Sequence, residues 1–503
     1  MTQHSLRRTY NGKFYRATHF TILPIEWRSP AVWYIALVIA GASIGVLSYH
    51  LGDSLDAVAV QISLAALIVM VMALRAWHIT RSNGYGDVFH PCLFPMLYVA
   101  FSFLAPMWMA FVVGDPPRAL SRSTPISSIS TALLVVGVLS FSFATLATAR
   151  FDKPKPLKYR FTGATALRSG QILITVPIGI SAISAFQGRV ATRGADQAST
   201  NITDTFDALL TPVAIAAVTL MLMGNRVLKN EKLLSRIDLV EIMILLALTA
   251  ARGTRGDIFA VVLLITVAHA HRRGKYRTIA VAGVLMLVAA VGVLQYRIDA
   301  KGGQVDHTAT EMILGDMAVA GYTTGATAAV VPDAQPYEYG RTYVEAMMRQ
   351  LPSPIATPMF GEPDHTGPRI FREIVGLNNP NQGYGFSIPA EGYLNFGIGG
   401  IVFACGLLGL LYAWAYPRMS FVNGRLSGVL YPVLVSALPF GLRADSLGFA
   451  KNVLYPLVAI GIVLVVARAQ YRREVRAPEK SNASRHKKEG ASVSSAGSIG
   501  CVS

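Results

Sequence analysis

Residues 389–416 read PAEGYLNFGIGGIVFACGLLGLLYAWAY, and Glu391 is the single charged side chain in this stretch. A helix of about 20 predominantly apolar residues is enough to cross the hydrocarbon core of a bilayer. The stretch is therefore long enough to span a membrane. A carboxylate at its beginning is costly there unless it is paired or used.

Similar apolar runs recur along the 503-residue chain, which is 52% hydrophobic and 15% charged. Soluble domains carry about 25% charged residues, so the composition excludes a cytosolic globular protein and a disordered protein. With three cysteines, two of them inside apolar runs, a disulfide-rich secreted scaffold is also excluded. The sequence predicts an all-α polytopic integral membrane protein. About 12 transmembrane helices are expected, near residues 31–49, 55–77, 91–113, 126–148, 169–186, 207–224, 237–251, 257–270, 278–296, 389–416, 426–441 and 450–468.

The distribution of charge predicts how these helices are oriented. With a cytoplasmic N-terminus, the inner segments hold 31 of the 45 Lys and Arg residues, and the outer segments hold 19 of the 28 Asp and Glu residues. This asymmetry follows the positive-inside rule, so we expect both termini to be cytoplasmic. The net charge of +17 is then explained by topology and lipid contact, and no nucleic acid partner is expected.

The predicted topology divides the chain into five regions. A large outer loop has weaker apolar periodicity, which favours short amphipathic helices, and Pro368 is typical of the first turn of one of them. The regions are a basic cytoplasmic N-terminus (1–30), a transmembrane bundle with spans 1–9 (31–296), the large outer loop (297–388), spans 10–12 (389–468) and a disordered basic cytoplasmic tail (469–503).

A short outer turn carries the most informative cations. Residues 251–259 read ARGTRGDIF, with Arg252, Arg255 and Asp257 between two apolar runs. Positive charge outside opposes the positive-inside rule, so topology does not account for it. Because the planar guanidinium binds phosphate oxygens bidentately, we predict that this turn binds a lipid-borne phosphate. The alternative is a turn whose arginines snorkel and anchor two helices.

Further arginines begin or populate the outer loop. Arg297 ends the ninth predicted span, and Arg341 and Arg349 both lie in RTYVEAMMR. In a helix their separation leaves the two side chains about 80° apart around the axis, so that both could contact one anionic ligand. As surface arginines they could equally have no specific partner.

Two outer residues are candidates for acid–base chemistry. His365 lies in the Pro- and Gly-rich segment GEPDHTGPR, which could form a lid over a substrate. An imidazole titrates near neutral pH, as a general base requires, although an outer histidine is often only solvated. Glu391 stands where the loop re-enters the membrane, and we weigh a catalytic use equally against an ion pair with an outer arginine.

No metal site is predicted. The chain has no Walker lysine motif, no HExxH sequence and no CxxC pair. Asp53 and Asp56 could form an acidic metal-binding pair, but their loop is short and a helix cap explains them equally well.

Three local stretches, with the architecture over about residues 30–470, resemble the Wzy-type O-antigen or oligosaccharide repeat-unit polymerases of bacterial envelopes. One is the RG-x-RG-D turn that begins at Arg252. Another is YGRTYVEAMMRQLPSPI, residues 339–355. The third and most specific is GFSIPAEGYLNFGIGG, residues 385–400, which is similar to the family's Glu, aromatic and Asn-Phe-Gly re-entry into a late span.

The resemblance implies a multi-pass protein of the bacterial inner membrane, with a helical fold similar to that of the GT-C-type lipid-linked sugar transferases. It implies a metal-independent glycosyltransferase, without cofactor or nucleotide sugar, that joins undecaprenyl-pyrophosphate-linked oligosaccharides at the outer face. The lipid bilayer, a chain-length regulator (a polysaccharide co-polymerase) and a flippase are the further partners implied.

The same resemblance implies roles for individual residues. Glu391 or His365 would deprotonate the acceptor hydroxyl. The charge of the leaving pyrophosphate would be stabilised by arginines, namely Arg252, Arg255, Arg297, Arg341 and Arg349. Sugars would be bound by Tyr337, Tyr339, Asn381 and Tyr384.

Two alternatives remain open on sequence alone. An O-antigen ligase shares this general layout but transfers the finished polymer to a lipid-anchored core acceptor. A lipid-linked oligosaccharide flippase should carry polar residues near the membrane midplane and paired interrupted helices. The predicted spans are almost uncharged apart from Glu241, which favours the enzyme.

Overall fold

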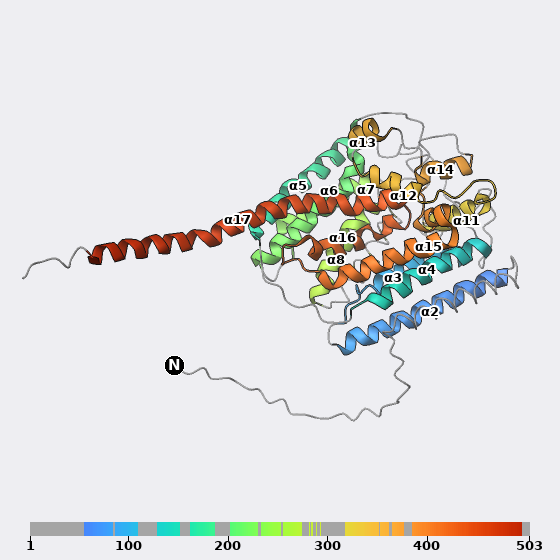
Figure 1. The fold of residues 1–503 in the computed structure, drawn as a ribbon, viewed down its shortest axis with the longest axis horizontal. Coiled ribbons are helices and arrows are strands. Elements are labelled where there is room, and N and C mark those ends of the chain that lie inside the picture. Colours follow the sequence, from blue (N-terminus) through green and yellow to red (C-terminus); the bar gives the residue numbers. More distant parts are fainter. Residues whose placement is uncertain are drawn as a thin grey trace, which may run out of the picture.

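The computed structural model describes most of the chain between residue 55 and residue 494. The described residues are 55–83, 86–108, 128–150, 161–186, 202–229, 233–252, 255–273, 281, 283, 284, 288, 292, 317–351, 353–361, 365–376 and 385–494. Within these ranges every regular element is a helix (Figure 1).

The helices form a bundle with a group of short helices at one end (Figure 1). The long helices are α2 (Leu55–Ser82), α3 (Phe94–Trp108), α4 (Ser128–Thr148), α5 (Gly163–Phe186), α6 (Ile202–Lys229), α7 (Arg236–Ala251), α8 (Arg255–Arg273), α15 (Ile388–Ala415), α16 (Leu426–Gly441) and α17 (Ser446–Ser494). The short ones are α11 (Val319–Val330), α12 (Arg341–Met348), α13 (Ser353–Phe360), α14 (Gly367–Ile374) and the 3₁₀ turn η2 (Tyr416–Arg418).

Six of the described helices are long and apolar enough to cross a membrane: α2, α4, α5, α6, α15 and α17. Parts of α3, α8 and α16 are apolar but shorter. The first predicted span, 31–49, lies outside the described residues, as does most of the ninth, 278–296. The count of about 12 spans therefore stays a prediction, whereas an all-helical membrane architecture is confirmed.

Small residues let the long helices approach one another closely. A Cβ added at Gly170 of α5 would lie 2.8 Å from the carbonyl oxygen of Ala217 in α6. A Cβ at Gly224 of α6 would lie 2.6 Å from the amide nitrogen of Leu167 in α5. Such contacts are typical of membrane helices, whose association depends on close packing because lipid is as apolar as the side chains.

Helix α15 is broken near its beginning. Phe396 and Gly397 have non-helical backbone angles, and Gly397 has φ 60° and ψ −144°, a conformation that essentially only glycine adopts. The break turns the chain so sharply that a Cβ on Gly400 would lie 1.9 Å from the carbonyl oxygen of Gly392. The predicted tenth span is therefore a short helical segment, a turn and a longer helix.

The large outer loop contains the expected short helices in its described part. Figure 1 shows α11, α12 and α14 at the same end of the bundle. Helix α11 differs from the amphipathic helix that we expected, because the side chains from Val319 to Thr327 are all buried. It packs against α3, α4 and α15. A helix buried on all sides carries no amphipathic pattern in its sequence.

Contacts between segments divide between the two ends of the bundle. At one end the hydroxyl of Tyr416 donates to Asp87 over 2.9 Å, and both residues lie in or beside segments predicted to be inner. At the other end the hydroxyl of Tyr455 donates to the carbonyl of Gln350 over 2.7 Å, and both lie in or beside outer segments. In both contacts, segments predicted to lie on the same side of the membrane touch each other, as the predicted topology requires.

Helix α17 continues to Ser494, well beyond the twelfth predicted span (Figure 1). The sequence predicts a disordered tail from residue 469, whereas residues 469–494 are helical in the structure. Residues 469–475, AQYRREV, consist mainly of good helix formers and contain no glycine or proline, so the helix can continue past the predicted span.

Candidate active site

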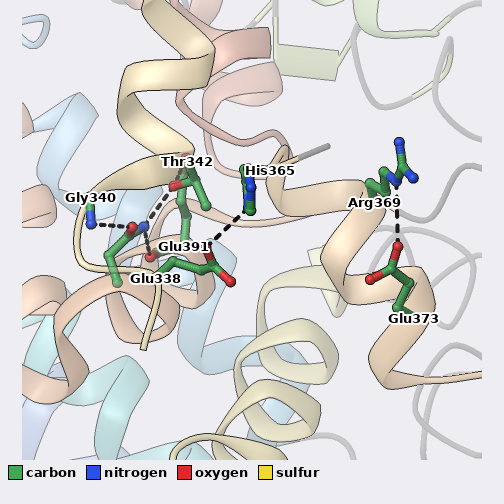
Figure 2. Close-up of polar contacts among 8 residues, drawn as sticks. Glu338, Gly340, Thr342, His365, Arg369, Glu373 and Glu391 are labelled. Carbon is green, nitrogen blue, oxygen red and sulfur yellow. Dashed lines mark hydrogen bonds and ion pairs between the residues drawn. The ribbon is translucent and has the colours of Figure 1, made fainter. Parts of the chain in front are cut away.

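An imidazole and a carboxylate meet at the loop end of the bundle (Figure 2). Nδ1 of His365, just before α14, lies 3.4 Å from Oε2 of Glu338, just before α12. The side chain of His365 is 46% exposed and that of Glu338 is 11% exposed. The contact is an ion-pair distance and not a hydrogen bond, and Oε2 of Glu338 is a buried oxygen that accepts no hydrogen bond in the described structure. Because the carboxylate lies on the Nδ1 side of the ring, Nε2 is the nitrogen that remains for a substrate proton.

Residues 338–340 are held against the break of α15. The amide of Glu338 donates to the carbonyl of Leu394 over 3.0 Å, and that of Tyr339 donates to the carbonyl of Asn395 over 3.2 Å. The amide of Gly340 donates to Oδ1 of Asn395 over 2.8 Å. These carbonyls are available because the helix stops at the break. Tyr339 has φ 47° and Gly340 has φ 90°, so the tight turn uses a sparsely populated backbone conformation.

Glu391 lies behind this turn and is fully buried, with 1% of its surface exposed. One carboxylate oxygen accepts the hydroxyls of Thr342, over 2.9 Å, and Ser446, over 2.8 Å. The other accepts the amide of Ser446 over 2.6 Å. Nδ2 of Asn395 donates to the hydroxyl oxygen of Thr342 over 2.6 Å, so this hydroxyl gives its own proton to Glu391 (Figure 2). Burial raises the pKa of neighbouring Asp445.

The two predicted bases thus differ in their surroundings. His365 presents its ring to the surface, whereas Glu391 is surrounded by donors from its own chain. Sequence reasoning missed Glu338 because nothing in PYEYGR distinguishes it from other loop carboxylates. Only the fold brings it to His365.

The loop arginines do not share one surface. Arg341 is exposed at the first residue of α12. Arg349 is buried: its Nε donates to Oε1 of Glu345 over 2.8 Å, and its Nη2 donates to the carbonyl of Gly361. Arg349 therefore connects the end of α12 to the end of α13.

Arg252 lies at the C-terminal end of α7, in a small pocket between α5, α6, α7 and α8. Its Nη1 is 3.2 Å from the hydroxyl of Ser181, to which it donates. The hydroxyl of Thr211 donates to Asp257 in the same pocket. One guanidinium, two hydroxyls and a carboxylate thus gather at the same end of the bundle as the outer loop.

Several predicted site residues cannot be placed. Arg255 begins α8, but its side chain is outside the described part of the structure. Arg297, Asn381 and Tyr384 lie outside the described residues.

Tyrosines flank the carboxylate of the pair. The ring centroids of Tyr337 and Tyr339 are 6.2 Å apart, and those of Tyr337 and Tyr393 are 6.4 Å apart, both edge to face. Tyr339 is 73% exposed. Tyr393 comes from α15, so residues from the loop and from a membrane helix form one aromatic group next to Glu338.

Comparison with known proteins identifies the family. A family model described as O-antigen polysaccharide polymerase Wzy matches residues 32–472. The chain belongs to the Wzy family. The match covers both members of the His365–Glu338 pair and the whole outer loop. No curated protein and no solved structure matches the chain.

Membership of the Wzy family confirms the resemblance seen in the sequence. A Wzy polymerase with these apolar helices is a multi-pass membrane protein of polysaccharide biosynthesis, and the family implies a polymerising glycosyltransferase. Among the described residues, no group of three or more His, Cys, Asp and Glu side chains could hold a metal ion.

Proposed function

We propose that the protein polymerises oligosaccharide repeat units carried on undecaprenyl pyrophosphate, at the outer face of the bacterial inner membrane. The observation that carries the proposal is the exposed imidazole of His365 held 3.4 Å from the carboxylate of Glu338. Family membership supports the reaction class, and the charge asymmetry supports the outer position of the loop.

In the proposed reaction, a hydroxyl of one repeat unit attacks the anomeric carbon of the growing chain. A glycosidic bond forms, the bond from that carbon to the pyrophosphate oxygen breaks, and the lipid pyrophosphate leaves with the electron pair. Nε2 of His365 accepts the hydroxyl proton, and Glu338 stabilises the resulting imidazolium through Nδ1.

Pyrophosphate is already a good leaving group, so the main requirement is to stabilise its developing charge. Arg252 serves this purpose at the end of α7, together with Arg255 and Arg297, and the exposed Arg341 reaches the substrate from α12. Fixed guanidinium groups give the positive charge that a metal ion provides in other phosphate chemistry, which supports a metal-independent transferase. Arg349, buried against Glu345, keeps the loop in place.

The aromatic group beside the pair binds sugar rings. Tyr337 and Tyr339 contact the repeat unit next to His365, Tyr393 extends this surface from α15, and Asn381 and Tyr384 add polar contacts. A flippase delivers the lipid-linked units, and a chain-length regulator limits the polymer.

The test is the size distribution of glycans in a strain that lacks the protein and is complemented with variants. His365→Gln should leave single lipid-linked repeat units on the outer face. Glu338→Gln should reduce polymer formation by about 10- to 100-fold because general-base catalysis contributes about 10²- to 10⁴-fold. Glu373→Gln, an exposed loop carboxylate paired with Arg369, is the matched control and should give normal polymer.

Other results would identify the alternatives. Long lipid-linked polymer that accumulates in the deletion strain would indicate a ligase. Repeat units retained on the inner face would indicate a flippase. Normal polymer with His365→Gln would exclude this histidine as the base.

A further inference from the structure

The buried network around Glu391 connects three parts of the molecule. Thr342 belongs to α12 of the loop, Asn395 to the last turn of α15 before its break, and Ser446 is the first residue of α17. The Glu391 carboxylate accepts hydrogen bonds from Thr342 and Ser446, with lengths between 2.6 and 2.9 Å.

This arrangement is unsuited to a general base. A base must present a lone pair within hydrogen-bond reach of the substrate proton. The carboxylate of Glu391 is 1% exposed and faces donors from Thr342 and Ser446. To reach a sugar hydroxyl it would have to break these bonds and leave buried donors unsatisfied, which costs free energy for each group.

The same network does reach the base indirectly. Asn395 donates to Thr342 and to the carbonyl of Glu391, and its Oδ1 accepts the amide of Gly340. The amides of Glu338 and Tyr339 bind the carbonyls at the end of the same helical turn. The turn that carries the Glu338 carboxylate is therefore fastened to α15 by the residues that Glu391 orders.

We infer that Glu391 is a positioning residue: through Thr342 and Asn395 it holds the 338–342 turn so that Glu338 faces His365, and through Ser446 it fastens that turn to α17. This inference rests on the proposed function, because it assigns His365 as the base and Glu391 as its support. The sequence named Glu391 and His365 as alternative bases, and this inference gives them separate roles.

The first measurement needs no substrate. Glu391→Gln keeps the shape of the side chain but turns one acceptor into a donor, which opposes the donors of Ser446. In the purified full-length protein, the amides of residues 338–344 should then exchange with deuterium at least about tenfold faster. Glu373→Gln, a glutamate of the same loop with an exposed ion pair, should leave this exchange unchanged.

The second measurement uses lipid-linked repeat units extracted from the deletion strain. Glu391→Gln should lower kcat by about 10- to 100-fold with little change in KM, because the substrate contacts remain. The residual activity should still depend on His365. Thr342→Val should give a smaller loss of the same kind, and Thr342→Ser should restore activity because it keeps the hydroxyl. These threonine variants keep the test decisive if Glu391→Gln does not fold.

Each contrary outcome has a separate meaning. Unchanged exchange together with abolished turnover in Glu391→Gln would overturn the inference in favour of direct catalysis. Unchanged exchange and unchanged turnover would overturn it as well. Full activity in His365→Gln would refute the proposed base, whereas faster exchange of residues 338–344 would still support the fastening role of Glu391.

Discussion

His90 shows how burial fixes the protonation of a single side chain. It lies between α2 and α3, fully buried at the end of the bundle that is predicted to be inner. The amide of Cys92 donates to its Nδ1 over 3.3 Å, so Nε2 must be the protonated nitrogen, and it faces the carbonyl of Arg150 at 3.4 Å. Burial lowers the pKa of His90 from 6.5 to about 4. The folded protein therefore keeps this imidazole neutral.

The lowered pKa predicts a loss of stability in acid. Between pH 6.5 and about pH 4 the unfolded chain binds a proton at His90 that the folded protein does not, so stability falls as the pH falls through this window. From about pH 7.5 to about pH 5 the loss is about 2 kcal/mol. In detergent, the melting temperature of His90→Gln should fall less over this pH range than the melting temperature of the wild type. His78→Gln, on the exposed face of α2, should behave like the wild type. An equal acid response of His90→Gln and the wild type would refute the prediction.

Unusual local patterns singled out two residues of the sequence, whose roles stay predictions. Arg252 stood out because an outer cation opposes topology, and it lies at the end of α7 in a small, mainly apolar pocket that also holds Ser181 and Asp257. His365 stood out by its side chain and lies exposed at the loop end. Glu338 had no such signal, since its role depends on a contact between distant parts of the loop. The burial of Glu391 among hydrogen-bond donors also depends on three elements that the sequence does not place together.

At the scale of elements, the break of α15 depends on two glycines that touch. Gly392 and Gly400 lie on either side of the turn at Phe396 and Gly397, and their backbones are in contact. This contact allows the first segment of the helix to lie beside the second. The turn thus presents the free carbonyls that hold residues 338–340.

Gly400→Ala should therefore destabilise the protein. The added methyl would lie 1.9 Å from the carbonyl oxygen of Gly392, which forces the two segments apart. We expect a loss of roughly 1–3 kcal/mol, the range of overpacked cores, and a lower melting temperature in detergent. The neighbouring Gly399 has no atom within 4 Å of the corresponding position, so Gly399→Ala is the matched control and should be tolerated. Equal stability of the two variants would contradict this account of the break.

The sequence predicts the long elements better than their interruptions. Apolar length identified α2, α4, α5, α6, α15 and α17 as membrane helices. It did not reveal the break in α15, because apolar composition continues through NFGIGG. It also misjudged α11, whose burial on all sides results from neighbours distant in sequence.

For the whole molecule, the two ends of the bundle contain different sets of segments. The end with Asp87 and Tyr416 gathers the segments predicted to be inner, and the opposite end gathers the outer loop and α17's first residue. The contacts indicate which segments lie on the same side of the membrane. The charge asymmetry predicts which of the two sides is cytoplasmic.

Labelling of single cysteines tests this assignment. In a chain without Cys92, Cys405 and Cys501, a cysteine at Met347, which is 77% exposed on α12, should react with a membrane-impermeant maleimide in spheroplasts. A cysteine at Arg473, exposed on α17, should react only after permeabilisation. The opposite pattern would invert the topology and place the His365–Glu338 pair in the cytoplasm.

The way in which the 338–340 turn is attached has a consequence for how the protein can diversify. Two of its three contacts join main chain to main chain, so they do not depend on the side chains of Glu338 and Tyr339. Gly340, at φ 90°, and Tyr339, at φ 47°, have left-handed backbone angles that restrict which residues can stand at these two positions. Over evolution, Tyr339 can therefore be exchanged for residues that tolerate a left-handed backbone, such as Asn, Asp or His, and that suit other glycans, while the main chain stays fixed. Specificity for a different repeat unit can then change by substitution of side chains in the turn, while its backbone contacts with α15 are kept.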